Sequence, residues 1–153
     1  MKTHCEKFTL GRMGTVTSIL LSALLVYGAI AVWSAGMTAV IVTYIIYALL
    51  AVWVLLNMPR YLIIQNGLLI ITHPIGRTVI EKSQVVKIEA IERSDLRGSL
   101  RLFGSDGFFG WFGIFRNSKF GTYRLYCGQL ENLYLVKTTT KKYIISSSVP
   151  IEL

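Results

Sequence analysis

The sequence predicts an α+β membrane protein in which an antiparallel two-helix transmembrane hairpin precedes a small all-β sandwich or partly open barrel. Two observations predict this class. The 47 residues from Met13 to Pro59 contain no Lys, Arg, Asp, Glu or His. After Arg60, short β-type segments alternate with turn residues, and little helical periodicity is left. That second part, of roughly 90 residues, has room for one domain.

The uncharged block is long enough to cross a bilayer twice. A helix rises about 1.5 Å per residue, so a hydrocarbon core of about 30 Å needs about 20 residues. We expect a hairpin over residues 14–58, with spans at about 16–34 and 38–57 and a turn near Gly36. The alternative is a buried hairpin of a soluble protein, but the remaining residues are too few to cover two wholly apolar helices.

The distribution of charge predicts the orientation of this hairpin. Residues 1–13, which we expect to form a tail, carry Lys2, Lys7 and Arg12 against Glu6, and the segment from Arg60 onward carries 13 Lys and Arg against 7 acids. The positive-inside rule therefore predicts that both termini are cytoplasmic. A cleaved signal peptide is the alternative, but the apolar stretch is longer than a usual signal core and a second span follows at once.

Small side chains predict where the helices pack. Ser18, Ser22 and Ala29 share one stripe of the first helix with Leu25, and such a stripe lets a neighbouring helix approach closely. Apart from tyrosines, no ionisable group lies at membrane depth. Pumps and proton-coupled transporters usually need such a group, so transport is disfavoured.

The second part reads as a series of antiparallel strands. Asn66-Gly67 suits a two-residue hairpin turn between strands at Tyr61–Gln65 and Leu68–Thr72. Further strands are predicted at Arg77–Glu81, Val85–Glu92, Leu100–Phe103, Thr122–Cys127, Leu133–Thr138 and Tyr143–Ser146. We assign residues 60–153 to this one β domain.

The segment from Phe103 to Phe115 has glycine at every third position and aromatic residues in most of the gaps. It lacks Gly-Lys-Ser/Thr, so a phosphate-binding loop is disfavoured. Two interpretations stay open. In one, the segment is a strand-loop-strand whose aromatic side chains fill the core. In the other, it is an exposed edge that contacts the membrane or a partner; the candidate residues are Phe108, Phe109, Trp111, Phe112 and Phe115.

This segment also carries a family resemblance. The run Arg101-Leu-Phe-Gly-Ser-Asp-Gly-Phe-Phe-Gly-Trp-Phe-Gly113 resembles a signature of one branch of the bacterial pleckstrin-homology-type (bacterial PH) membrane proteins. The segments Gly121–Cys127, Leu133–Thr138 and Tyr143–Ser146 resemble the strands that follow it there, and the similarity covers roughly residues 60–150. It implies two nearly orthogonal packed sheets closed by a helix, a domain without known catalytic residues, and a place in the inner membrane of a bacterium.

The chain departs from that family pattern at two places. At most one helical turn fits after Val149, so we expect the closing helix to be short or absent, with the open end covered by another subunit or by the hairpin. The turn at Gln65–Gly67 is uncharged, so specific inositol-phosphate binding is not carried over.

No catalytic, cofactor-binding or metal-binding residues are predicted. His4 and His73 have no Cys, Asp or Glu at metal-ligand spacing, and Cys5 and Cys127 are expected to stay reduced in the cytoplasm. The basic residues of the domain are candidate contacts for anionic lipid, and a solvated basic surface is the alternative. These residues are Arg93, Arg97, Arg101, Arg116, Lys119 and Arg124. Nucleic acid is disfavoured, because a domain held at the inner leaflet meets anionic lipid first.

Three classes of function remain open. The first is a non-enzymatic, membrane-anchored module for scaffolding or assembly, with a homo-oligomer or a membrane protein as partner. The second is binding of anionic lipid, or membrane organisation, through the Gly/aromatic run and the basic loops. The third is an accessory subunit of a transporter or envelope complex.

Overall fold

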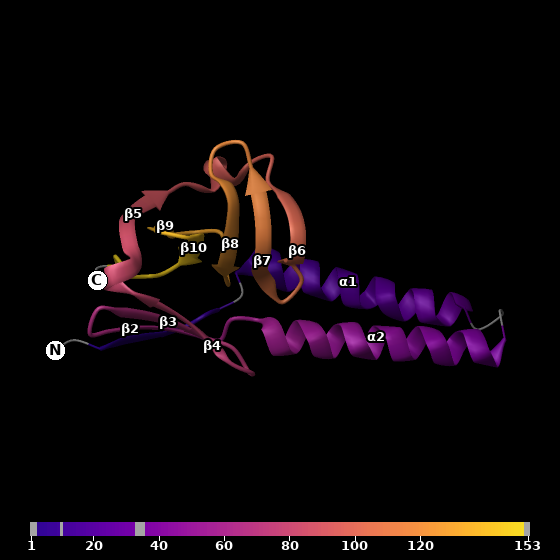
Figure 1. Ribbon diagram of the computed structural model, residues 1–153. Coiled ribbons are helices and arrows are strands. Elements are labelled where there is room, and N and C mark those ends of the chain that lie inside the picture. The colour runs from indigo at the N-terminus through magenta and orange to yellow at the C-terminus, as the bar shows by residue number, and fades with distance from the viewer. Residues whose placement is uncertain (1–2, 10, 33–35, 152–153) are drawn as a thin grey trace.

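The computed structural model describes residues 3–9, 11–32 and 36–151, which form a helical hairpin and a β domain (Figure 1). Helix α1 spans Arg12–Ala31 and α2 spans Met37–Asn57. Gly36 precedes α2 with φ of 100°, a conformation that favours glycine. Residues 33–35, which include the first part of the predicted turn, lie outside the described residues.

The two helices differ as candidate membrane spans. Within the described residues, α2 is long and apolar enough to cross a bilayer, whereas the apolar part of α1 is a shorter stretch, Thr15–Gly28. The predicted hairpin of two spans therefore stays a prediction. Both helices leave most apolar side chains uncovered, with Leu24 64% exposed and Leu49 65% exposed.

The first sheet has four strands, in the order β1-β2-β3-β4. Strands β2 (Tyr61–Gln65), β3 (Leu68–Thr72) and β4 (Arg77–Glu81) have the predicted bounds, and β2 and β3 are joined through Asn66-Gly67, both at positive φ. Strand β1 (His4–Lys7) pairs antiparallel with β2 and was not predicted, because residues 1–13 were assigned to a tail. Its side chains are exposed or half-buried, so this edge strand has no apolar alternation to reveal it.

The second sheet has six strands, in the order β5-β9-β10-β8-β7-β6. They are β5 (Val85–Ile91), β6 (Leu100–Gly107), β7 (Gly110–Asn117), β8 (Gly121–Cys127), β9 (Leu133–Thr138) and β10 (Lys142–Ser146). The expectation of a purely antiparallel domain is wrong at one pair, because β10 returns from β9 into the place beside β8 and lies parallel to it. Short 3-10 turns, η2 (Lys82–Gln84) and η3 (Arg93–Leu96), flank β5.

The strands of the two sheets cross at a steep angle, as the resemblance implies (Figure 1). No helix follows β10 in the chain described through Ile151. Ile151 is instead 4% exposed and packs with the residues between the sheets, and the Ser148 amide donates to the Glu6 carboxylate at 2.9 Å. The last described residues are thus held by strand β1.

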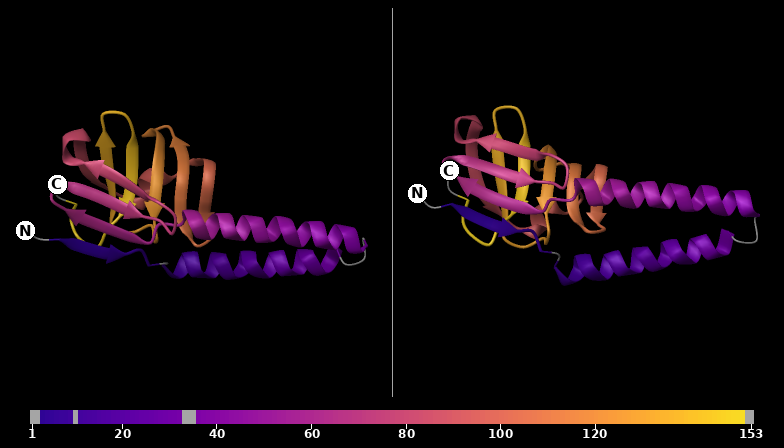
Figure 2. Two further views of the ribbon diagram at one scale, coloured as in Figure 1. Left: turned by 60° about the horizontal axis from the view of Figure 1, so that its bottom comes forward. Right: turned by 90° about the horizontal axis from the view of Figure 1, so that it is seen from below.

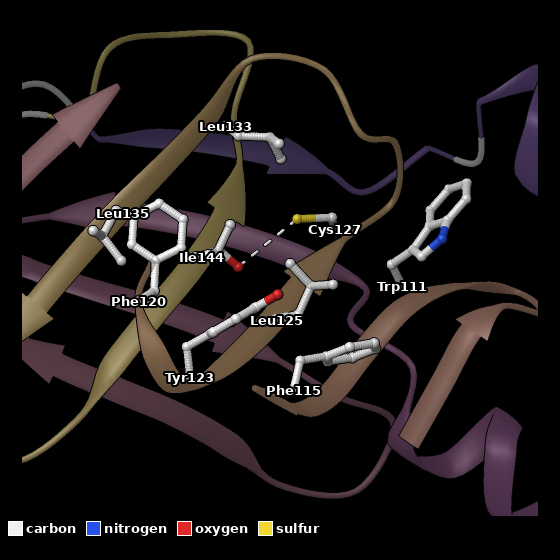
Figure 3. Packing of buried hydrophobic residues seen from close by; sticks show 9 residues of the cluster. All are labelled: Trp111, Phe115, Phe120, Tyr123, Leu125, Cys127, Leu133, Leu135 and Ile144. Atoms are coloured by element: carbon white, nitrogen blue, oxygen red, sulfur yellow. Dashed lines mark hydrogen bonds between the residues drawn. The ribbon is translucent and has the colours of Figure 1, made fainter. Parts of the chain in front are cut away.

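The apolar core has two clusters, which the period-2 alternation of the strands separates. Along β10, Ile144 belongs to one cluster, whereas Tyr143 and Ile145 belong to the other. The first cluster, shown in Figure 3, surrounds Cys127, whose thiol donates to the Ile144 carbonyl at 3.7 Å. Burial raises the pKa of the Cys127 thiol to about 12.

Candidate functional site at the junction of hairpin and domain

The Gly/aromatic run folds into the hairpin of β6 and β7. Gly107 pairs with Gly110 on either side of the Phe108-Phe109 turn, and Gly104 pairs with Gly113 further along. A Cβ atom on Gly104 would lie 2.1 Å from the Phe112 carbonyl oxygen, because the two backbones meet there without side chains. The four glycines thus recur at every third residue because they pair with one another across a hairpin whose turn is Phe108-Phe109.

The structure places the five predicted aromatic contacts unequally. Trp111, Phe112 and Phe115 are buried, at 8%, 2% and 3% exposed, and Trp111 and Phe115 belong to the first core cluster. Within this chain they form no exposed edge, so the core-filling interpretation holds for them. Phe108 and Phe109 at the turn are half-buried.

The exposed apolar side chains lie on β6 instead. Leu100, Leu102 and Phe103 are 71%, 57% and 60% exposed, and β6 is one of the two edge strands of its sheet. Figures 1 and 2 show that this edge is the side of the β domain from which the helices extend. The predicted strand begins at Leu100, as β6 does. Its position at the edge was not predicted, because the order of strands in a sheet is not encoded locally.

Helix α1 contacts the turn of this hairpin through Ser18. Its hydroxyl accepts a hydrogen bond from the Phe109 amide at 2.9 Å and donates to the Gly107 carbonyl at 3.4 Å. Phe109 has φ of 54°, which is uncommon for a bulky residue. Ser18 was predicted to pack against a helix, whereas the hydrogen bonds of its hydroxyl hold α1 to the β domain.

Helix α2 contacts the same hairpin through an aromatic pair. The Trp53 and Phe103 rings meet edge to face, with centroids 5.0 Å apart. Near this pair, the His73 ring lies 3.1 Å from the Asn57 carbonyl at the end of α2. Burial lowers the pKa of His73, against an opposing effect of its backbone hydrogen bonds. Neither contact was predicted, since each joins residues far apart in the sequence.

An apolar pocket of about 270 Å³ lies between the two helices and β6. Leu21 and Leu25 of α1, Leu50 and Val54 of α2, and Phe108 line it, and Arg101 is its charged lining residue. The pocket is open to the side, because Leu21 and Leu50 are 37% and 54% exposed. It therefore joins an apolar cleft to one guanidinium.

The six predicted lipid-contact residues do not form one patch. Arg101 lines the apolar pocket, Arg124 lines a second pocket with Trp53 and His73, and Arg93 lines a third with Arg12. Lys119 is paired with Asp95. Arg97 and Arg116 are exposed. Of the six, Arg101 and Arg124 lie at the junction of hairpin and domain.

Of the two remaining helix-packing candidates, the structure describes the side chain of one. Ser22 is half-buried, and the side chain of Ala29 lies outside the described residues. At Gly28, the Tyr47 side chain of α2 reaches α1, and an added Cβ would lie 3.2 Å from the Tyr47 hydroxyl oxygen. A small residue therefore allows the contact with Tyr47, and this residue is Gly28, one position before the predicted Ala29.

Two steeply crossed sheets joined to a pair of apolar helices define a PH-like module on a helical hairpin. In the described part of the chain, no three His, Cys, Asp or Glu side chains lie together to hold a metal ion. A family model described as "Bacterial PH domain" matches residues 60–151, and the chain belongs to that family. Comparisons with curated proteins and with solved structures find no match.

Proposed function

We propose that this protein is a non-enzymatic, membrane-anchored PH-like module that serves protein assembly at the cytoplasmic membrane of a bacterium. Both helices cross the bilayer, both termini are cytoplasmic, and the β domain rests against the inner leaflet. PH domains are generally non-catalytic modules, and the family match supports that class.

One observation carries the proposal: the apolar helices are fixed to the domain but are not covered by it. Ser18 and Trp53 attach the bases of α1 and α2 to the β6–β7 hairpin. Beyond these contacts, exposed side chains such as Leu24 and Leu49 leave a large apolar surface that water disfavours. A bilayer removes that cost and, with the domain fixed to the helices, sets the angle at which the domain meets the membrane.

The topology can be tested with cysteines on the two sides. Cys5 is exposed on β1, and Ser34→Cys in a Cys5→Ser background places one thiol near the predicted tip. In intact bacterial spheroplasts, a membrane-impermeant maleimide should label the thiol introduced at position 34 but not the native Cys5, and permeabilisation should expose Cys5. Labelling of Cys5 before permeabilisation, or protection of both thiols until then, would contradict two spans with cytoplasmic termini.

Assembly can be tested by the mass of the full chain in mild detergent. We expect a homo-oligomer over a broad concentration range, because the small-residue stripe and the uncovered helix surfaces offer contacts. Ser22→Leu fills that stripe and should reduce the association, whereas Val26→Leu on the same helix should not. A strict monomer at every concentration would exclude self-assembly.

A further inference from the structure

We propose that the apolar pocket between α1, α2 and β6 binds an anionic phospholipid, with an acyl chain in the pocket and the phosphate on Arg101. The inference rests on the proposed membrane anchoring and adds a specific lipid site to it. It assigns Arg101, rather than the whole basic surface, as the residue that selects the headgroup.

The depth of the pocket matches such a ligand. Counting from Arg12, Ser18 is about 9 Å along α1, and Leu25 is about 20 Å along it. The β6–β7 turn, which contacts Ser18, therefore lies beside the uncharged part of α1, and the pocket extends from that level toward the tip of the hairpin. An acyl chain that enters beside Arg101 would run in the direction of the helices.

The charge of the pocket also matches. Arg101 is exposed, and none of the carboxylates of the described residues forms an ion pair with it. Its neighbours on the edge strand, Leu100, Leu102 and Phe103, are exposed apolar side chains that suit the membrane interface. A guanidinium binds phosphate through two parallel hydrogen bonds, which favours a phospholipid over an uncharged lipid or a detergent chain.

The position of β6 favours the bilayer over a second protein copy as the occupant of this edge. An uncovered apolar edge strand normally invites pairing with another chain. Here the edge faces along the helices, on the side that the bilayer occupies in the proposed anchoring (Figure 2). Its apolar surface is continuous with α2 through the contact of Phe103 and Trp53.

Quenching of Trp53 fluorescence can test the site, because Trp53 lines the pocket. The full chain carrying Trp33→Phe, which keeps Trp53 and Trp111, is reconstituted in phosphatidylcholine vesicles. The same chain with Trp53→Phe added gives the fluorescence background from Trp111. Phosphatidylglycerol or phosphatidylcholine with the same brominated chains is then added at a low mole fraction. We expect about fivefold stronger quenching by the anionic lipid, the effect of one favourable cation at an anionic surface.

Matched variants separate the site from general surface charge. Arg101→Gln should abolish the preference, and Arg101→Lys should keep most of it. Arg97→Gln removes an equal charge outside the pocket and should leave the preference unchanged. Ala51→Phe, which fills the pocket while keeping Arg101, should abolish the preference as well. An unchanged melting temperature in each variant shows that the fold is retained.

The other outcomes identify which proposal fails. Equal quenching by both lipids, or an equal loss in Arg97→Gln and Arg101→Gln, would overturn the phospholipid site and leave the anchoring intact. No quenching by either lipid would overturn the anchoring. A disulfide between two copies carrying Leu102→Cys in a Cys5→Ser background would show that a second copy occupies the edge, which also overturns the lipid site.

Discussion

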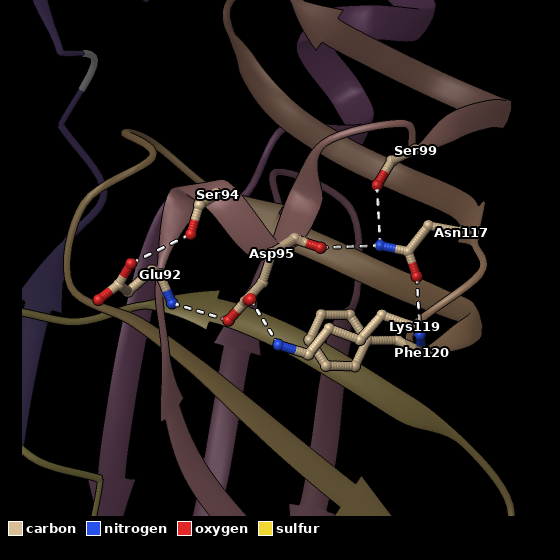
Figure 4. A network of polar contacts seen from close by, with 7 residues as sticks. All are labelled: Glu92, Ser94, Asp95, Ser99, Asn117, Lys119 and Phe120. Atoms are coloured by element: carbon tan, nitrogen blue, oxygen red, sulfur yellow. Dashed lines mark hydrogen bonds and ion pairs between the residues drawn. The ribbon is translucent and has the colours of Figure 1, made fainter.

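The two ends of strand β7 differ in what surrounds them. At its start, Gly110 follows a turn whose backbone groups are hydrogen-bonded to the Ser18 hydroxyl of helix α1. At its end, Asn117 belongs to a polar network within the domain (Figure 4). The Asn117 amide group donates to the Asp95 carbonyl and the Ser99 hydroxyl, and its oxygen accepts from the Phe120 amide at 2.7 Å.

The two ends of β7 differ in whether their polar groups need a partner from another element. The Asn117 end satisfies its polar groups internally and presents charge to solvent, as Asp95 and Lys119 do. The Gly110 end depends on Ser18 of α1 for its turn, whereas the exposed apolar side chains of β6 lie toward the other end, where Leu100 pairs with Arg116. The end of β7 that meets α1 is therefore the end that is incomplete by itself.

The largest effect is expected at the glycine pair of the β6–β7 hairpin. Gly104→Ala or Gly113→Ala should destabilise the fold by about 3 kcal/mol or more, because each Cβ would lie 2.1–2.2 Å from a backbone oxygen and both residues have positive φ. Thermal unfolding in detergent measures this loss. Gly98→Ala is the control: it also has positive φ, but nothing lies within 4 Å, so strain alone should cost about 1 kcal/mol. Equal losses at Gly98 and Gly104 would show that close approach is not the cause.

The second effect is expected at the polar end. Asn117→Ala removes three hydrogen bonds from a side chain that is 8% exposed, so we expect a loss of about 2–3 kcal/mol in unfolding free energy. Ser94→Ala, which removes an exposed hydroxyl bonded to Glu92 in the same network, should cost less than about 0.5 kcal/mol. If both variants have the wild-type denaturant midpoint, the Asn117 hydrogen bonds do not contribute to the stability of the domain.

A third prediction concerns the link between hairpin and domain. Ser18→Ala leaves the Phe109 amide without its hydroxyl acceptor, which should cost about 1–2 kcal/mol. Hydrogen exchange at that amide should speed up, while exchange in the Asn117 network stays unchanged. Ser22→Ala, one turn further along α1, should affect neither. Unchanged exchange at Phe109 in the Ser18 variant would mean that the link does not protect the turn.

Local sequence signals predict part of this fold. The Asn66-Gly67 turn and the apolar strands beside it give the hairpin of β2 and β3, since both signals are local. The strand-loop-strand interpretation of the Gly/aromatic run corresponds to the observed hairpin of β6 and β7, although the bounds of β7 were not predicted.

The candidate site was less predictable, because it is formed by contacts across the chain. Ser18 and Phe109 are separated by 91 residues, and Trp53 meets Phe103 from another element. Composition identified Arg101 and the aromatic residues as candidates, but not which of them are buried. Trp111 and Phe115 lie inside because their face of β7 packs against residues of β8, β9 and β10 in the first core cluster, and such packing across the sheet is not encoded locally.

The smallest effect is expected from acid at the polar end. The hydrogen bond from Lys119, with the Glu92 amide adding to it, holds the pKa of Asp95 below its ordinary value of 3.8. A lowered pKa means that folding favours the charged carboxylate, so this contribution is present above about pH 4 and is lost as the pH falls through the folded pKa. Lys119→Gln should therefore be slightly less stable than the wild type at pH 6, and the two should converge below pH 4, as measured by their denaturant midpoints. The pair is exposed to solvent, so salt should also reduce the difference. Since the link at the Gly110 end is a hydrogen bond between uncharged groups, Ser18→Ala should keep its deficit at both pH values, and a deficit that disappeared in acid would show that the two ends are coupled.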